Sequence, residues 1–147
     1  MHQEGEYYID HPPEVVFEYM NQPSNAAEVS PTLENSEGVR VADNGGWVVR
    51  AEYEVAGGIA DGELILQPDA FEPEEKIRYT LDDDISGYVE WRFEEEGDGT
   101  MFTYEAEYTV EIPVPSFFME TVGRQITQRE LDAIISNLRT QVDEYAD

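Results

Sequence analysis

Residues 102–112 read FTYEAEYTVEI and form the most regular segment of this 147-residue chain. Apolar or aromatic residues alternate with Thr and Glu from one end of the run to the other. Because successive side chains of a β-strand point to opposite faces of the sheet, this alternation predicts a strand with one buried and one solvated face.

The segments before this run repeat the same pattern at shorter length. Each is closed by residues that favour turns, such as Asp43-Asn44-Gly45-Gly46, Gly57-Gly58 and Gly97-Asp98-Gly99. Short turns between strands predict an antiparallel meander. The predicted strands contain Val39 and Val41, then residues 47–55, a segment around Leu64 and Leu66 that ends near Pro68, residues 77–81 and residues 89–93.

The amino-terminal part predicts a strand over residues 6–10 followed by two short helices. Pro12 and Pro13 suit the first turn of a helix, where a missing N–H loses no hydrogen bond. Residues 16, 17 and 20 then give that helix one apolar side. The second helix spans about residues 25–29 and ends before Pro31.

After Pro113 and Pro115 a long helix is predicted to run from about residue 116 to about residue 145. Its second half carries an apolar stripe with 4-3-4-3 spacing, made of Leu131, Ile135, Leu138, Val142 and Tyr145. The apolar residues of its first half lie on nearly the opposite side, at about 100° per residue. We therefore expect a bend near Gly123, or a first half that covers a cavity or meets a second subunit.

This order of elements, together with the motif Pro12-Pro13-Glu14-Val15-Val16-Phe17, resembles the START/polyketide-cyclase superfamily, also called SRPBCC, helix-grip or birch-pollen-allergen-like. The Pro113-Val114-Pro115 segment before the long helix resembles the family too, and the resemblance covers essentially the whole chain. It implies a single α+β domain over residues 1–147. In that domain a seven-stranded curved antiparallel sheet wraps around a long C-terminal helix, with two short helices after the first strand.

The resemblance also implies an apolar cavity between sheet and helix that binds a hydrophobic small molecule of lipid, quinone or polyketide-like type. Tyrosines are frequent on the predicted inner face, and a buried hydroxyl needs a partner such as water or a ligand. From the first half of the long helix, apolar residues and one arginine would complete the wall. The candidate ligand-binding residues are Tyr53, Tyr79, Trp91, Tyr104, Tyr108, Phe118, Met119, Val122, Ile126 and Arg129.

Two alternatives stay open from the sequence. The first is a polyketide cyclase or dehydratase that uses Tyr, Glu or Arg129 in the same cavity, although no particular catalytic residue is identified. The second is a protein-interaction or regulatory domain that uses the outward strip of Phe118, Val122 and Ile126, as a monomer or a homodimer. His2, assigned to a frayed terminus, and His11, assigned to a surface turn, show no partner, so we predict no metal site and no cofactor.

The charge of the chain limits its partners. Eight basic residues against 34 acidic ones give a net charge of −26, which excludes general binding to nucleic acid. The absence of cysteine excludes disulfides. With no apolar run near the roughly 18 residues of a membrane span, and no visible signal peptide, we expect a cytoplasmic protein.

Acidic residues are spread along the whole chain and Lys76 is the only lysine, which predicts a protein from a high-salt cytoplasm. The alternative is an acidic face that binds a basic partner. In about 1 M salt the Debye length is about 3 Å, so repulsion among the carboxylates fades.

We expect the melting temperature to be higher in molar KCl than in dilute buffer, as measured by circular dichroism. Equal midpoints in the two solutions would contradict this interpretation.

Overall fold

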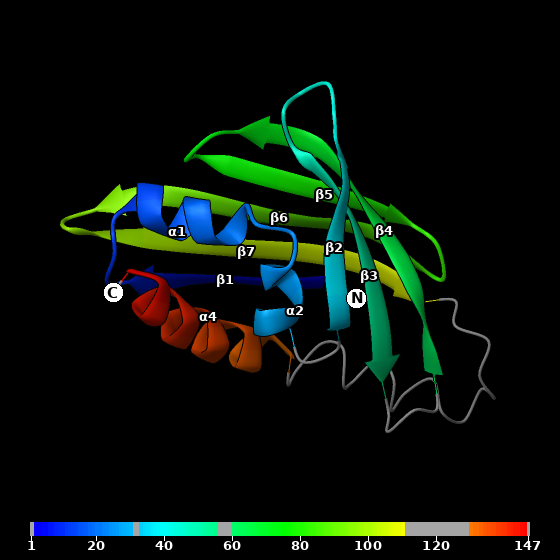
Figure 1. Ribbon diagram of the computed structural model, residues 1–147. Coiled ribbons are helices and arrows are strands. Elements are labelled where there is room, and N and C mark those ends of the chain that lie inside the picture. Colours follow the sequence, from blue (N-terminus) through cyan, green and yellow to red (C-terminus); the bar gives the residue numbers. More distant parts are fainter. Residues whose placement is uncertain (1, 31–32, 56–59, 111–129, 147) are drawn as a thin grey trace.

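The computed structural model describes residues 2–30, 33–55, 60–110 and 130–146 (Figure 1). In these residues the chain forms seven strands and three helices. The predictions that concern residues 111–129, including the bend near Gly123, lie outside the described residues.

All seven strands join one antiparallel sheet in the order β1-β7-β6-β5-β4-β3-β2. The connections from β2 to β7 are successive hairpins, so the predicted meander is confirmed. The first strand returns to pair with the last one, which places β1 at one edge and β2 at the other. The strands are β1 (His2–Ile9), β2 (Leu33–Val41), β3 (Trp47–Val55), β4 (Ala60–Glu72), β5 (Lys76–Asp82), β6 (Ile85–Glu96) and β7 (Gly99–Val110).

The period-two pattern of β7 places its apolar side chains on the inner face. Phe102, Tyr104 and Ala106 are each at most 3% exposed. On β6 they lie opposite Phe93, Trp91 and Val89 respectively, which share the same face. The sheet therefore has one apolar face that other elements have to cover.

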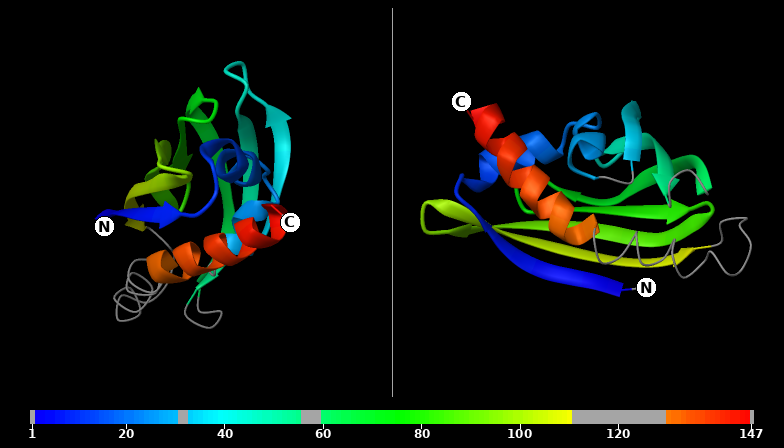
Figure 2. Two further views of the ribbon diagram at one scale, coloured as in Figure 1. Left: turned by 90° about the vertical axis from the view of Figure 1, so that its left-hand side faces the viewer. Right: turned by 90° about the horizontal axis from the view of Figure 1, so that it is seen from below.

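Three helices lie on that face, and Figure 2 shows the sheet curled around the side on which they lie. These helices are α1 (Pro13–Met20), α2 (Asn25–Val29) and α4 (Glu130–Ala146). From α1 the buried residues include Val16, Phe17 and Met20, as its apolar stripe predicts. No helix in the described part of the chain has the length and apolarity needed to span a bilayer.

The stripe of α4 is confirmed for Ile135, Leu138 and Val142, which are buried in the core. Tyr145 departs from it, because the residue is 39% exposed. Its ring meets the edge of the Tyr19 ring at a centroid distance of 5.7 Å, and its hydroxyl bonds to Glu18. The last turn of α4 thus contacts α1 rather than the sheet.

The predicted bounds of the first and fourth strands and the assignments of both histidines were wrong. The first strand begins at His2 rather than residue 6, because eight residues pair with β7. His2 is therefore part of a strand and not of a frayed terminus. His11 also has a partner, since its Nε2 lies 2.6 Å from Oδ1 of Asp143.

The fourth strand does not end near Pro68 but continues to Glu72. A register shift between Pro68 and Ala70 lets the strand pass the proline, which has no N–H to donate to the ladder. A second irregularity, between Gly38 and Arg40, lies where the ring of Trp47 approaches the backbone. A Cβ on Gly38 would come within 2.7 Å of that ring, so only glycine fits there.

The packing of α4 on the sheet is open to a direct stability test. Leu138 is 0% exposed, so Leu138→Ala should lower the free energy of unfolding by about 2–5 kcal/mol through lost burial and a residual cavity. Ser136→Ala, at an exposed position of the same helix, should change it by less than about 0.5 kcal/mol. Urea denaturation measures both, and equal effects would contradict this account of α4.

Candidate ligand-binding cavity

Between the inner face of the sheet and the helices lies a cavity of about 100 Å³. Its walls come from β2 to β7 and from all three described helices, together with Gln22, Pro23 and Ser30 beside α2. Most of the lining side chains are aliphatic or aromatic.

Four residues predicted from the sequence line this cavity together: Tyr53, Tyr79, Trp91 and Tyr104. They come from β3, β5, β6 and β7, and period-two alternation turns all four toward the same side. The side chain of Tyr108 lies outside the described part of the structure, as do Phe118, Met119, Val122, Ile126 and Arg129.

The sequence interpretation missed the contribution of the helices and of the segment after them. Met20 of α1 and Val29 of α2 line the cavity, as do Leu33 at the start of β2 and Ile134 of α4. The apolar stripe of α1 marked Met20 as buried but did not distinguish a core position from a cavity wall. Ile134 lies beside the predicted stripe of α4, so helical periodicity alone gave no signal for it.

The hydroxyl groups in the cavity have different environments. Tyr53 donates a hydrogen bond of 3.4 Å to Oδ2 of Asp84 at the end of the β5–β6 turn. Burial, followed by the negative charge of Asp84, raises the pKa of Tyr53 to about 12. Burial alone raises the pKa of Tyr79 to about 12. Both phenols therefore stay protonated at neutral pH and act as hydrogen-bond donors.

Among the described residues that line the cavity, none is an Asp, Glu, His, Lys or Arg. The most buried carboxylate, Glu90, is 4% exposed, but its neighbours Val89 and Trp91 line the cavity. Its side chain therefore points to the outer face of the sheet. There its carboxylate lies 2.7 Å from Nε of Arg92, 3.6 Å from Nη1 of Arg78 and 4.0 Å from Nζ of Lys76.

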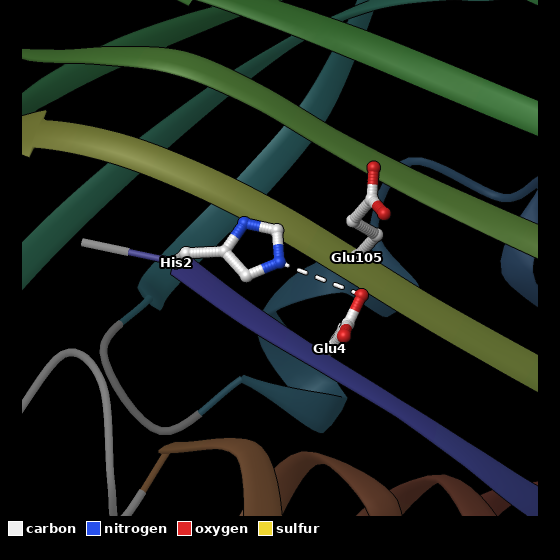
Figure 3. Close-up of side chains that lie close together, drawn as sticks. All are labelled: His2, Glu4 and Glu105. Atoms are coloured by element: carbon white, nitrogen blue, oxygen red, sulfur yellow. Dashed lines mark ion pairs between the residues drawn. The ribbon is translucent and has the colours of Figure 1, made fainter.

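A second group of titratable side chains lies on the outer face, at the pairing of β1 with β7. His2, Glu4 and Glu105 bring their ligand atoms within 4.8 Å of one another (Figure 3). Nε2 of His2 lies 3.5 Å from Oε2 of Glu4, and Glu105 accepts a hydrogen bond from the hydroxyl of Tyr88. His2 and Glu4 are exposed to solvent, and the group has no connection to the cavity.

A family model described as "Polyketide cyclase / dehydrase and lipid transport" matches residues 3–143. The fold is the helix-grip type, as the resemblance implied. The chain belongs to the polyketide cyclase/dehydrase and lipid transport family. No curated protein matches the chain.

Solved structures with this fold are distant in sequence. The protein TTHA0849 from Thermus thermophilus is 19% identical, with a TM-score of 0.76 and 100% of both chains covered. The ZhuI aromatase/cyclase from Streptomyces sp. R1128 is 17% identical, with a TM-score of 0.74 over 100% of this chain and 96% of that one. A START superfamily protein from Mycobacterium smegmatis is 15% identical, with a TM-score of 0.71 and 97% of each chain covered.

The raised pKa of Tyr79 predicts how the free energy of unfolding changes at alkaline pH. In the unfolded chain the phenol of Tyr79 ionises near pH 10, whereas in the folded chain it ionises only near pH 12. The contribution of Tyr79 to the free energy of unfolding is therefore complete below about pH 10 and is lost as the pH approaches about 12. The variant Tyr79→Phe has no phenol to ionise at this position, so this loss of stability at alkaline pH does not occur in it. The difference in unfolding free energy between wild type and variant should fall by about 2–3 kcal/mol across this range.

Urea titrations at a series of pH values measure this difference. Tyr53 and Tyr19 are present in both proteins, so their own titrations cancel in the comparison. Stability curves that stay parallel between about pH 9 and about pH 12 would contradict a buried phenol at position 79.

Proposed function

We propose that this protein binds or carries a hydrophobic small molecule in the cavity between the sheet and the C-terminal helix. The apolar cavity of about 100 Å³ carries the proposal. Voids of this order hold small apolar guests, and one of about 150 Å³ accommodates benzene. The family description and a relative named as an aromatase/cyclase support a guest of lipid, quinone or polyketide-like type.

The ligand-binding residues of this proposal are the described wall residues Tyr53, Tyr79, Trp91 and Tyr104. Their rings offer edges and faces to an aromatic guest, while the aliphatic residues between them exclude water. Tyr108, Phe118, Met119, Val122, Ile126 and Arg129 remain predicted contributors from the sequence.

Catalysis of the cyclase or dehydratase type is the second candidate, supported by the family description. General-base chemistry needs a group whose pKa lies near the working pH. The described cavity wall supplies tyrosines, and those with pKa values near 12 donate protons poorly and do not accept them at neutral pH. The chemistry of the described wall therefore favours binding over catalysis, and a general base would have to come from the segment 111–129.

The third candidate, a protein-interaction domain, depends on Phe118, Val122 and Ile126. These residues lie outside the described part of the structure, so this candidate stays a prediction from the sequence.

Filling the cavity should weaken binding. Val89 is 8% exposed and lines the cavity, so Val89→Phe places a larger side chain inside it. We expect native mass spectrometry to show a 1:1 adduct of wild type with menadione or naphthalene, used as neutral ring-sized probes with and without a carbonyl group. In the variant the affinity should fall by at least about tenfold, with a stability cost of about 1–3 kcal/mol from overpacking.

Val39→Phe is the matched control, because Val39 is 54% exposed on the edge strand and lies away from the cavity wall. It should bind the probes as wild type does. An absence of adducts with both probes, or binding that Val89→Phe leaves unchanged, would refute the proposal.

A further inference from the structure

The hydroxyl of Tyr79 stands apart from the other polar groups of the cavity. Tyr53 donates to Asp84, and Ser30 and Tyr104 have interactions of their own. Within the described part of the chain, Tyr79 has no hydrogen-bond partner for its hydroxyl, although its ring contacts Trp91. The residue is 3% exposed and forms part of the cavity wall.

A hydroxyl that lines an apolar cavity and has no protein partner is costly unless something in the cavity accepts its hydrogen bond. Leaving such a donor without a partner destabilises a folded protein by about 1–3 kcal/mol. A phenylalanine at this position would fill the same space at no such cost. A donor directed at a cavity can recover this energy only from something that enters the cavity, either water or an acceptor on a bound molecule.

The position of this hydroxyl is fixed by its surroundings. Tyr79 lies in the middle of β5, opposite Pro68 on one side and Val89 on the other. Its ring meets the ring of Trp91 edge-to-face, with centroids 5.4 Å apart and an interplanar angle of 74°. A side chain held by two neighbouring strands and a tryptophan loses little entropy when it donates a hydrogen bond to a guest.

The size and lining of the cavity limit the class of molecule that can carry the acceptor. Its volume of about 100 Å³ suits a compact, ring-sized group better than an extended acyl chain. The described wall residues include no cationic side chain, so they offer no countercharge to an ionised guest that has lost its hydration. The net charge of −26 opposes the approach of anions as well.

We propose that Tyr79 donates a hydrogen bond to the carbonyl oxygen of a neutral, compact, ring-containing guest, so that the ligand class is aryl ketones and quinones rather than fatty acids or anions. This inference rests on the proposed binding function and adds the polar contact that selects among apolar guests.

Two probes of nearly equal shape test the contact. Acetophenone carries a C=O group where α-methylstyrene carries C=CH₂. NMR titration gives the affinity of each protein for each probe, and we expect the preference for acetophenone over α-methylstyrene to be about tenfold greater in wild type than in Tyr79→Phe. Comparing the preference of the two proteins cancels the solvation of each probe. The infrared C=O band of bound acetophenone should lie at lower frequency in wild type than in the variant.

Tyr88→Phe is the control, since Tyr88 also carries a hydroxyl but donates it to Glu105 on the outer face. This variant should keep the preference of wild type. If both probes bind wild type and the ratio is the same in Tyr79→Phe, the proposed binding function stands and the Tyr79 contact is refuted. If neither probe binds wild type, the proposed function and the inference that rests on it both fail.

Discussion

The one-sided burial of a curved antiparallel sheet is the constraint on which the rest of this structure depends. Strict alternation along β6 and β7 gathers the apolar side chains on one face, and that face has to be removed from water. Two short helices and α4 are what the described chain places there. A cavity of about 100 Å³ remains between these helices and the sheet.

The tyrosines give that void its chemical character. A core made of leucine and phenylalanine would leave a dry cavity with no preference among apolar guests. Tyr53 and Tyr79 instead bring hydroxyl groups that remain protonated at neutral pH. The buried acid Glu90 is held on the other side of the sheet by arginines, away from the cavity.

The sequence predicted the antiparallel meander and the inward-facing positions of the four aromatic residues, because both follow from periodicity and from turn residues. The cavity that they line was implied by the family resemblance. It did not predict the passage of β4 beyond Pro68, since a bulge leaves no mark in a single sequence. The pairing of His11 with Asp143 depends on tertiary contact over 132 residues. Cavity walls formed by Met20 and Ile134 could not be separated from ordinary core, because a void is what remains after all side chains have packed.

A crystal structure determined under xenon pressure tests the central claim most directly, because xenon occupies apolar cavities and is visible in electron density. The account predicts a xenon peak between the sheet and α4, bordered by Tyr79, Tyr104 and Ile134. Side chains in van der Waals contact across that space, with no xenon peak between them, would contradict it.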